Sequence, residues 1–143
     1  MQAVILALLA ICTICYCFDP RCLDKYLGTA FDECTFEHGG NKAYTTNWAG
    51  FRKSVDTNEK CFRACVLRKC DFLDEEAKIK EDVPLGLAIM LSGGNRSKVP
   101  SIEQAARACR NLMQYGDNIC ENTENWSRCI TEQCKRCGLE LKL

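Results

Sequence analysis

Thirteen cysteines among 143 residues constrain the fold of this chain more than any other feature of its sequence. Disulfide-rich chains are typical of oxidising, extracellular surroundings, whereas so many thiols would be a liability in a reducing compartment. The count is odd, so at least one cysteine of the full chain has no partner within it. An even-numbered disulfide framework therefore requires an odd number of the cysteines to lie outside it.

The first 17 residues, MQAVILALLAICTICYC, contain no charged side chain. Their apolar run is shorter than the roughly 20 residues of a membrane-spanning helix, and it fits the apolar region of a secretory signal peptide. We predict a signal peptide over residues 1–17 and a secreted, extracellular domain over residues 18–143. A buried helix and a lipoprotein signal ending at Cys12 are the alternatives. Removal of Cys12, Cys15 and Cys17 leaves ten cysteines, an even number that suits a disulfide framework.

The rest of the sequence predicts helices, because it contains few prolines and little alternation of β-branched residues. The clearest pattern spans residues 102–115, where apolar residues recur at the helical period, with Ser101 as the expected N-cap and Gly116 at the end. Further helices are expected over residues 57–70, over 124–137 with Gly138 as the stop, and over 21–34, 83–91 and 48–53. Residues 92–100 are expected to form a loop. This predicts an all-α, compact, disulfide-linked bundle of about six short helices.

The cysteines can be placed on these helices. Cys61 and Cys65 are four residues apart, so they share one face, and their parallel side chains cannot readily bond to each other. Each therefore needs a partner in another segment. Trp126, Ile130, Cys134 and Cys137 form one stripe of the last helix, which predicts that both late cysteines face the core.

The charged side chains balance, with 19 basic and 19 acidic residues. A chain without net charge lacks the basic surface that nucleic acids or anionic membranes require, so we predict neither partner. His38 is the single histidine, and its place beside Gly39 and Gly40 is more typical of a solvated loop residue than of the positioned base of an acyl-transfer triad. With one histidine we expect no histidine-driven pH switch.

The sequence Cys134-Lys135-Arg136-Cys137 is half of a zinc site or a candidate redox dithiol. Reactive pairs of this spacing lie at helix N-termini, where the dipole lowers the thiol pKa, but this pair lies at a predicted C-terminus. We therefore predict no enzyme activity, no metal and no cofactor.

The spacing of six of the cysteines is similar to that of a known protein family. Cys34-x26-Cys61-x3-Cys65-x43-Cys109-x10-Cys120-x8-Cys129 closely resembles the signature of insect odorant-binding proteins, in which the x3 and x8 gaps are the rigid part. The segment CFRACVLRKCDFLDEEAKI resembles that family's third helix and the turn after it. The resemblance covers essentially the whole of residues 18–143.

The resemblance implies a six-helix fold around an internal apolar cavity. It also implies the bridges Cys34–Cys65, Cys61–Cys120 and Cys109–Cys129. Four cysteines, Cys22, Cys70, Cys134 and Cys137, exceed the six-cysteine signature. Their even number suggests two further bridges, as in cysteine-enriched branches of the family, in a pairing that the sequence leaves open.

The implied function is that of a secreted carrier that binds and solubilises a small hydrophobic ligand, such as an odorant or pheromone. We expect a monomer, with a weak dimer as the alternative. A second reading is a venom or salivary effector on the same scaffold, acting through a protein or an amine ligand. The candidates for ligand contact are Trp48, Phe51, Leu87, Met90, Leu91, Leu112, Met113, Tyr115, Trp126 and Ile130. The C-terminal tail, residues 139–143, either lines the cavity or frays.

Overall fold

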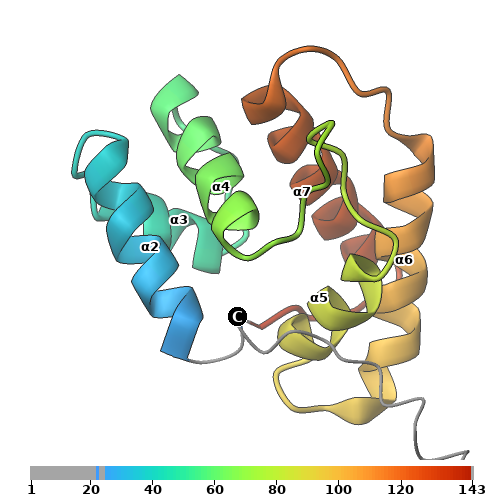
Figure 1. Ribbon diagram of the computed structural model, residues 1–143. Coiled ribbons are helices and arrows are strands. Elements are labelled where there is room, and N and C mark those ends of the chain that lie inside the picture. Colours follow the sequence, from blue (N-terminus) through green and yellow to red (C-terminus); the bar gives the residue numbers. More distant parts are fainter. Residues whose placement is uncertain (1–21, 23–24, 143) are drawn as a thin grey trace, which may run out of the picture.

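Six α-helices lie within residue 22 and residues 25–142, the part of the chain that this computed structural model describes (Figure 1). The predicted signal peptide, with Cys12, Cys15 and Cys17, lies outside the described residues. In chain order the helices are α2 (Lys25–Glu37), α3 (Ala43–Ala49), α4 (Thr57–Lys69), α5 (Val83–Leu91), α6 (Val99–Leu112) and α7 (Ile119–Arg136), with a short 3-10 helix, η2 (Arg96–Lys98), before α6.

The helices form two groups that α7 joins. Helices α2 and α3 pack against α4, and α5 packs against α6, while α7 contacts both α4 and α6 (Figure 1). The core where the groups meet includes Phe62, Val66, Ile102, Cys109 and Trp126, all nearly inaccessible to solvent. None of the described helices is both long and apolar enough to cross a membrane.

Local capping explains where α4 and α7 begin. The Asp56 side chain accepts the backbone N–H of Glu59 at 2.7 Å, so α4 starts at Thr57, as predicted. Helix α7 starts at Ile119, five residues before the predicted residue 124. The reason is that Asn118 accepts the backbone N–H groups of Cys120 and Glu121 at 3.0 and 3.2 Å.

Several other predicted boundaries are wrong, among them the end of α2, which is Glu37 and not the predicted residue 34. Helix α6 begins and ends three residues before the predicted range 102–115, because Pro100 stands in its first turn, where its missing N–H costs no hydrogen bond. Ser101 is therefore inside the helix and is not its N-cap, and the predicted loop over 92–100 contains η2 and the start of α6.

The helix predicted over residues 48–53 is α3, which spans residues 43–49 instead. It ends in a Schellman motif, in which the N–H of Arg52 bonds to the carbonyl of Asn47 and the N–H of Phe51 to that of Trp48, both at 2.9 Å. Phe51 takes the left-handed position of this motif, with φ 55°, which is uncommon for a bulky residue. The chain therefore leaves the helix abruptly at Phe51.

Four disulfides connect the described helices. Three of them, Cys34–Cys65, Cys61–Cys120 and Cys109–Cys129, are the pairs that the resemblance implies, and the fourth joins Cys22 to Cys70. They tie α2 to α4, α4 to the start of α7, and α6 to α7. Each such bridge typically stabilises a fold by about 2–4 kcal/mol.

The expectation of a second bridge among the extra cysteines is wrong in this structure, because Cys134 and Cys137 carry free thiols. Cys134 is fully buried, as the stripe with Trp126 and Ile130 predicts. Cys137 is exposed, contrary to that prediction. Helix α7 ends at Arg136, and Cys137 is the C-cap before the left-handed Gly138, so its side chain no longer continues the stripe.

Candidate functional site

An apolar cavity lies between the two groups of helices. Every helix except α6 contributes to its wall, together with the turn after α4 and the C-terminal tail. The lining residues are Leu27, Phe31, Trp48, Phe51, Val66, Leu67, Cys70, Phe72, Leu87, Met90, Leu91, Trp126, Ser127, Ile130, Thr131 and Leu141. The volume of the cavity is about 40 Å³, measured as the space open to the centre of a water-sized sphere. Typical ligand pockets hold roughly 300–1,000 Å³, so a ligand of odorant size requires side chains to move apart.

Aromatic rings form one end of the cavity. Phe31 and Trp48 make an edge-to-face contact with ring centroids 5.7 Å apart, and Phe31 stacks on Phe62 at 6.0 Å. Such pairs contribute about 0.5–1.5 kcal/mol beyond their buried area, so this end of the wall is comparatively rigid. The indole Nε1 of Trp126 is buried and has no hydrogen-bond partner among the described residues.

The C-terminal tail closes another part of the wall. The N–H of Lys142 donates to the carbonyl of Leu91 at 3.0 Å, and Ser92 and Lys142 form an isolated parallel bridge. This pairing places Leu141 in the cavity wall and Leu139 against the core. The tail was expected either to line the cavity or to fray, and in the structure it lines the cavity.

The structure brings seven of the ten predicted contact residues to this cavity: Trp48, Phe51, Leu87, Met90, Leu91, Trp126 and Ile130. Leu112, Met113 and Tyr115 do not line it. Leu112 is 72 % exposed. Because α6 ends at Leu112 and Met113 is extended, the chain turns away from the face that the predicted helix would have continued.

The wall has nine residues beyond the ten candidates, and one of them, Leu141, belongs to the tail that the sequence already offers as a lining segment. Leu27 and Phe31 are apolar and four apart on a predicted helix, which is a usable signal. Ser127 and Thr131 are also four apart, but they are polar, so a search for apolar residues passes over them. The remaining five are Val66, Leu67, Cys70, Phe72 and Leu141.

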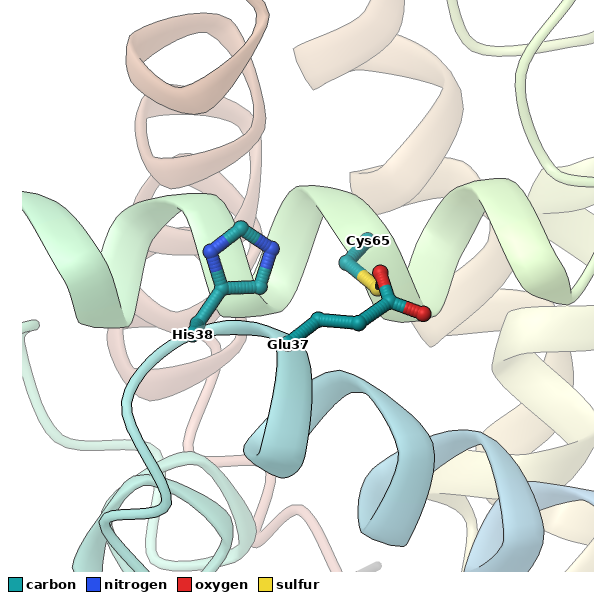
Figure 2. A group of neighbouring side chains, drawn as sticks. All are labelled: Glu37, His38 and Cys65. Carbon is teal, nitrogen blue, oxygen red and sulfur yellow. Dashed lines mark hydrogen bonds between the residues drawn. The ribbon is translucent and has the colours of Figure 1, made fainter.

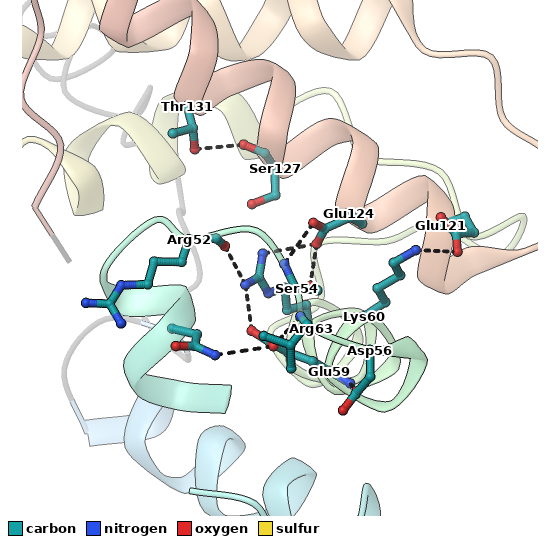
Figure 3. Close-up of polar contacts among 12 residues, drawn as sticks. Arg52, Ser54, Asp56, Glu59, Lys60, Arg63, Glu121, Glu124, Ser127 and Thr131 are labelled. Atoms are coloured by element: carbon teal, nitrogen blue, oxygen red, sulfur yellow. Dashed lines mark hydrogen bonds and ion pairs between the residues drawn. The ribbon is translucent and has the colours of Figure 1, made fainter. Parts of the chain in front are cut away.

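A buried charge network lies beside the cavity (Figure 3). Arg63, Glu59 and Glu124 each have no more than 2 % of their surface exposed. The guanidinium of Arg63 contacts Glu59 at 2.8 Å and Glu124 at 3.0 Å, and it donates to the backbone carbonyl of Arg52 at 2.7 Å. Ser54 donates to Glu124 through both its hydroxyl, at 2.6 Å, and its N–H, at 3.1 Å. The network thereby joins α4, α7 and the segment after α3.

The network also contacts the cavity wall. The guanidinium carbon of Arg63 lies 6.0 Å from the centroid of the Trp48 ring, within the range of a cation–π interaction. The Nε of Arg63 is buried without a hydrogen-bond partner among the described residues.

A second group of side chains has the composition of a metal site but not its chemistry. Ligand atoms of Glu37, His38 and Cys65 lie within 4.8 Å of one another at the end of α2 (Figure 2). Cys65 is bonded to Cys34, so it offers no thiolate, which is the form that binds metals. Glu37 is paired with Lys69 at 3.0 Å. The hydrogen bonds of Lys69 to Glu33 and, as the second cause, to Glu37 raise the pKa of this lysine. Two remaining ligands do not make a structural zinc site.

Comparisons with known proteins agree with this architecture. The model of the PBP/GOBP family matches residues 22–133. General odorant-binding protein 19d of Drosophila melanogaster is 30 % identical over 83 residues, which are 58 % of this chain and 55 % of that protein. The match thus spans about half the length of that relative. Odorant-binding protein dmelOBP28a of the same species has a similar fold, with a TM-score of 0.70 and 24 % identity, over 79 % of this chain and 93 % of that one.

Proposed function

The chain belongs to the PBP/GOBP family, and from that premise we propose that it is a secreted carrier that holds a small hydrophobic molecule in the cavity between α4, α5 and α7. The family and its fold are those of non-enzymatic carriers, and its members are secreted, soluble proteins that bind small hydrophobic ligands. Proteins similar to this chain carry odorant binding in their names.

The observation that carries the proposal is the wall of the cavity. Its residues are almost all aliphatic or aromatic, and its few polar groups are hydroxyls rather than charges. Such a wall favours transfer of an apolar molecule out of water by about 25 cal/mol for each Å² of apolar surface buried. Solubilisation and shielding follow from this transfer without a covalent step.

Entry of a ligand requires part of the wall to give way, because the cavity is small. Met90 and Leu141 are only partly buried, and Met90 has a flexible, polarisable side chain. Movement of these two side chains enlarges the space, whereas the stacked rings of Phe31 and Phe62 stay in place.

Displacement of an environment-sensitive apolar dye by neutral compounds such as decan-1-ol tests the proposal. We expect saturable dye binding and full displacement by the alcohol. Met90→Trp fills the cavity and lowers dye affinity at least tenfold, whereas Leu112→Trp, on an exposed site of α6, leaves it unchanged. Absence of dye binding, or an equal effect of the two variants in folded protein, would refute the cavity as the binding site.

A further inference from the structure

The apolar cavity shares three wall residues with a polar space at the surface, which we call the mouth. Phe51, Ser127 and Thr131 line both spaces. The volume of the mouth is about 180 Å³ by the same measure, and so exceeds the volume of the cavity. A ligand in the cavity therefore has a polar space next to one of its ends.

The mouth is predominantly basic. Beyond the shared wall it is lined by Arg52, Lys53, Arg63, Arg128, Lys135 and, as the single acidic residue, Glu132. Glu132 is paired with Arg128 at 3.1 Å, and Arg63 is held by its two buried glutamates. No carboxylate among the described residues pairs with Arg52, Lys53 or Lys135. These three cations are the surplus of positive charge at the mouth.

Two further donors on residues that line the mouth lack protein partners. The Nε–H of Arg63 is buried and unpaired, although Arg63 as a whole is only 1 % exposed. The hydroxyl of Ser127 points from α7 toward the Arg63 network, and it makes no hydrogen bond with a described residue (Figure 3). Because Ser127 lines the mouth and is only partly buried, its hydroxyl is free to donate to an acceptor atom there.

We propose that the chain is selective for amphipathic ligands with a carboxylate head, whose apolar tail occupies the cavity and whose head lies in this basic mouth. The inference rests on the proposed carrier function and adds the chemical class of the ligand. A carboxylate oxygen accepts a hydrogen bond from the Ser127 hydroxyl, and Lys53, Lys135 and Arg52 balance the charge. Hydrogen bonds to charged groups are roughly twice as strong as neutral ones, so an ionised head outweighs a neutral one here.

The test compares decanoate, decan-1-ol and methyl decanoate as competitors of the apolar dye, near neutral pH, where the carboxylate is ionised. We expect decanoate to bind about three- to tenfold more tightly than the two neutral analogues, a range that two or three partly solvated charge contacts supply. Added salt should narrow this difference, because exposed charges are screened.

A double variant, Lys53→Met with Lys135→Met, should remove the preference for decanoate and leave decan-1-ol affinity unchanged. The control, Lys78→Met with Arg96→Met, removes the same charge from exposed positions outside the cavity and the mouth, and should keep the preference. Equal affinities for decanoate and decan-1-ol, or a preference that survives the mouth variant, would overturn the head-group assignment and leave the carrier proposal standing. Failure of all three compounds to compete would instead refute the carrier proposal itself.

Discussion

Arg63 and Glu124, 61 residues apart in sequence, form an ion pair of 3.0 Å in which neither side chain is more than 3 % exposed. The pair fixes α4 against α7, and it does so next to the cavity, since Arg63 also contacts Trp48. Buried charges are costly to leave unpaired, so the geometry of the cavity wall depends on this pair remaining intact.

Removal of the guanidinium tests that dependence. Arg63→Leu leaves the Glu59 and Glu124 carboxylates buried without their cation, and we expect it to lower the free energy of unfolding by about 3–5 kcal/mol. Arg107→Leu is the matched control, because Arg107 forms an i,i+4 pair with Glu103 at 2.8 Å on the half-exposed surface of α6. Its loss should cost less than about 1 kcal/mol. Denaturant unfolding of the oxidised proteins measures both values, and equal losses would contradict the account.

The cap of α7 supports a second prediction. Asn118→Ala removes the acceptor for two backbone N–H groups and should destabilise the protein by about 1 kcal/mol. Asn125→Ala, at an exposed position in the middle of the same helix, should have no such cost, because alanine is the better helix former there. If thermal unfolding ranks the two variants in the opposite order, Asn118 is not the residue that starts the helix.

The two free cysteines should differ in reactivity. Burial raises the pKa of the Cys134 thiol above its usual range, and the neighbouring Cys137 raises it further. The reactive thiolate therefore forms poorly at Cys134, whereas the sulfur of Cys137 is exposed to reagents. With iodoacetamide at mildly alkaline pH, we expect mass spectrometry of the protein without residues 1–17 to find one label, on Cys137, in the folded state. Both cysteines should be labelled after denaturation without reductant, and a chain that takes up no label when denatured would show that the two thiols are bonded to each other.

The C-terminal tail should matter for binding more than for folding. Ending the chain after Gly138 removes Leu141 from the cavity wall and breaks the Lys142–Leu91 hydrogen bond. Loss of one apolar contact of this size corresponds to roughly a tenfold weaker dye affinity. Helical circular dichroism should be retained, because the tail lies outside the helices and is held by the isolated bridge and by single hydrogen bonds from Leu139 to Cys134 and from Lys98 to Glu140. Unchanged dye affinity in the shortened chain would exclude the tail from the site.

Local patterns in the sequence predict those helices whose ends are set by residues next to them in the chain. Helix α5 has the predicted bounds because it is one apolar run with Pro84 in its first turn. Helix α4 differs by one residue because its cap, Asp56, directly precedes it. The start of α7 was missed, since residues 119–123 are mostly polar and their helical state depends on Asn118. The position of α3 was missed because it ends at a left-handed phenylalanine, where a glycine is the usual signal.

The residues of the cavity wall are likewise predicted correctly only where the helix that carries them is placed correctly. Apolar residues on correctly placed helices, such as Leu87 and Ile130, lie where the sequence suggests. Leu112 does not, because a shift of three residues in the end of α6 places it in solvent. The Arg63–Glu124 pair leaves no local pattern at all, since its partners meet only after α4 and α7 have packed.

Tryptophan fluorescence tests the central claim most directly, because the only two tryptophans of the chain, Trp48 and Trp126, both line the cavity. In a Trp48→Phe variant, Trp126 is the sole reporter, and it is 2 % exposed. Titration with decan-1-ol should change its emission in a saturable way, with the affinity that dye displacement gives for the same variant. Saturable displacement of the dye with no change in Trp126 emission would place the ligand elsewhere and contradict the account.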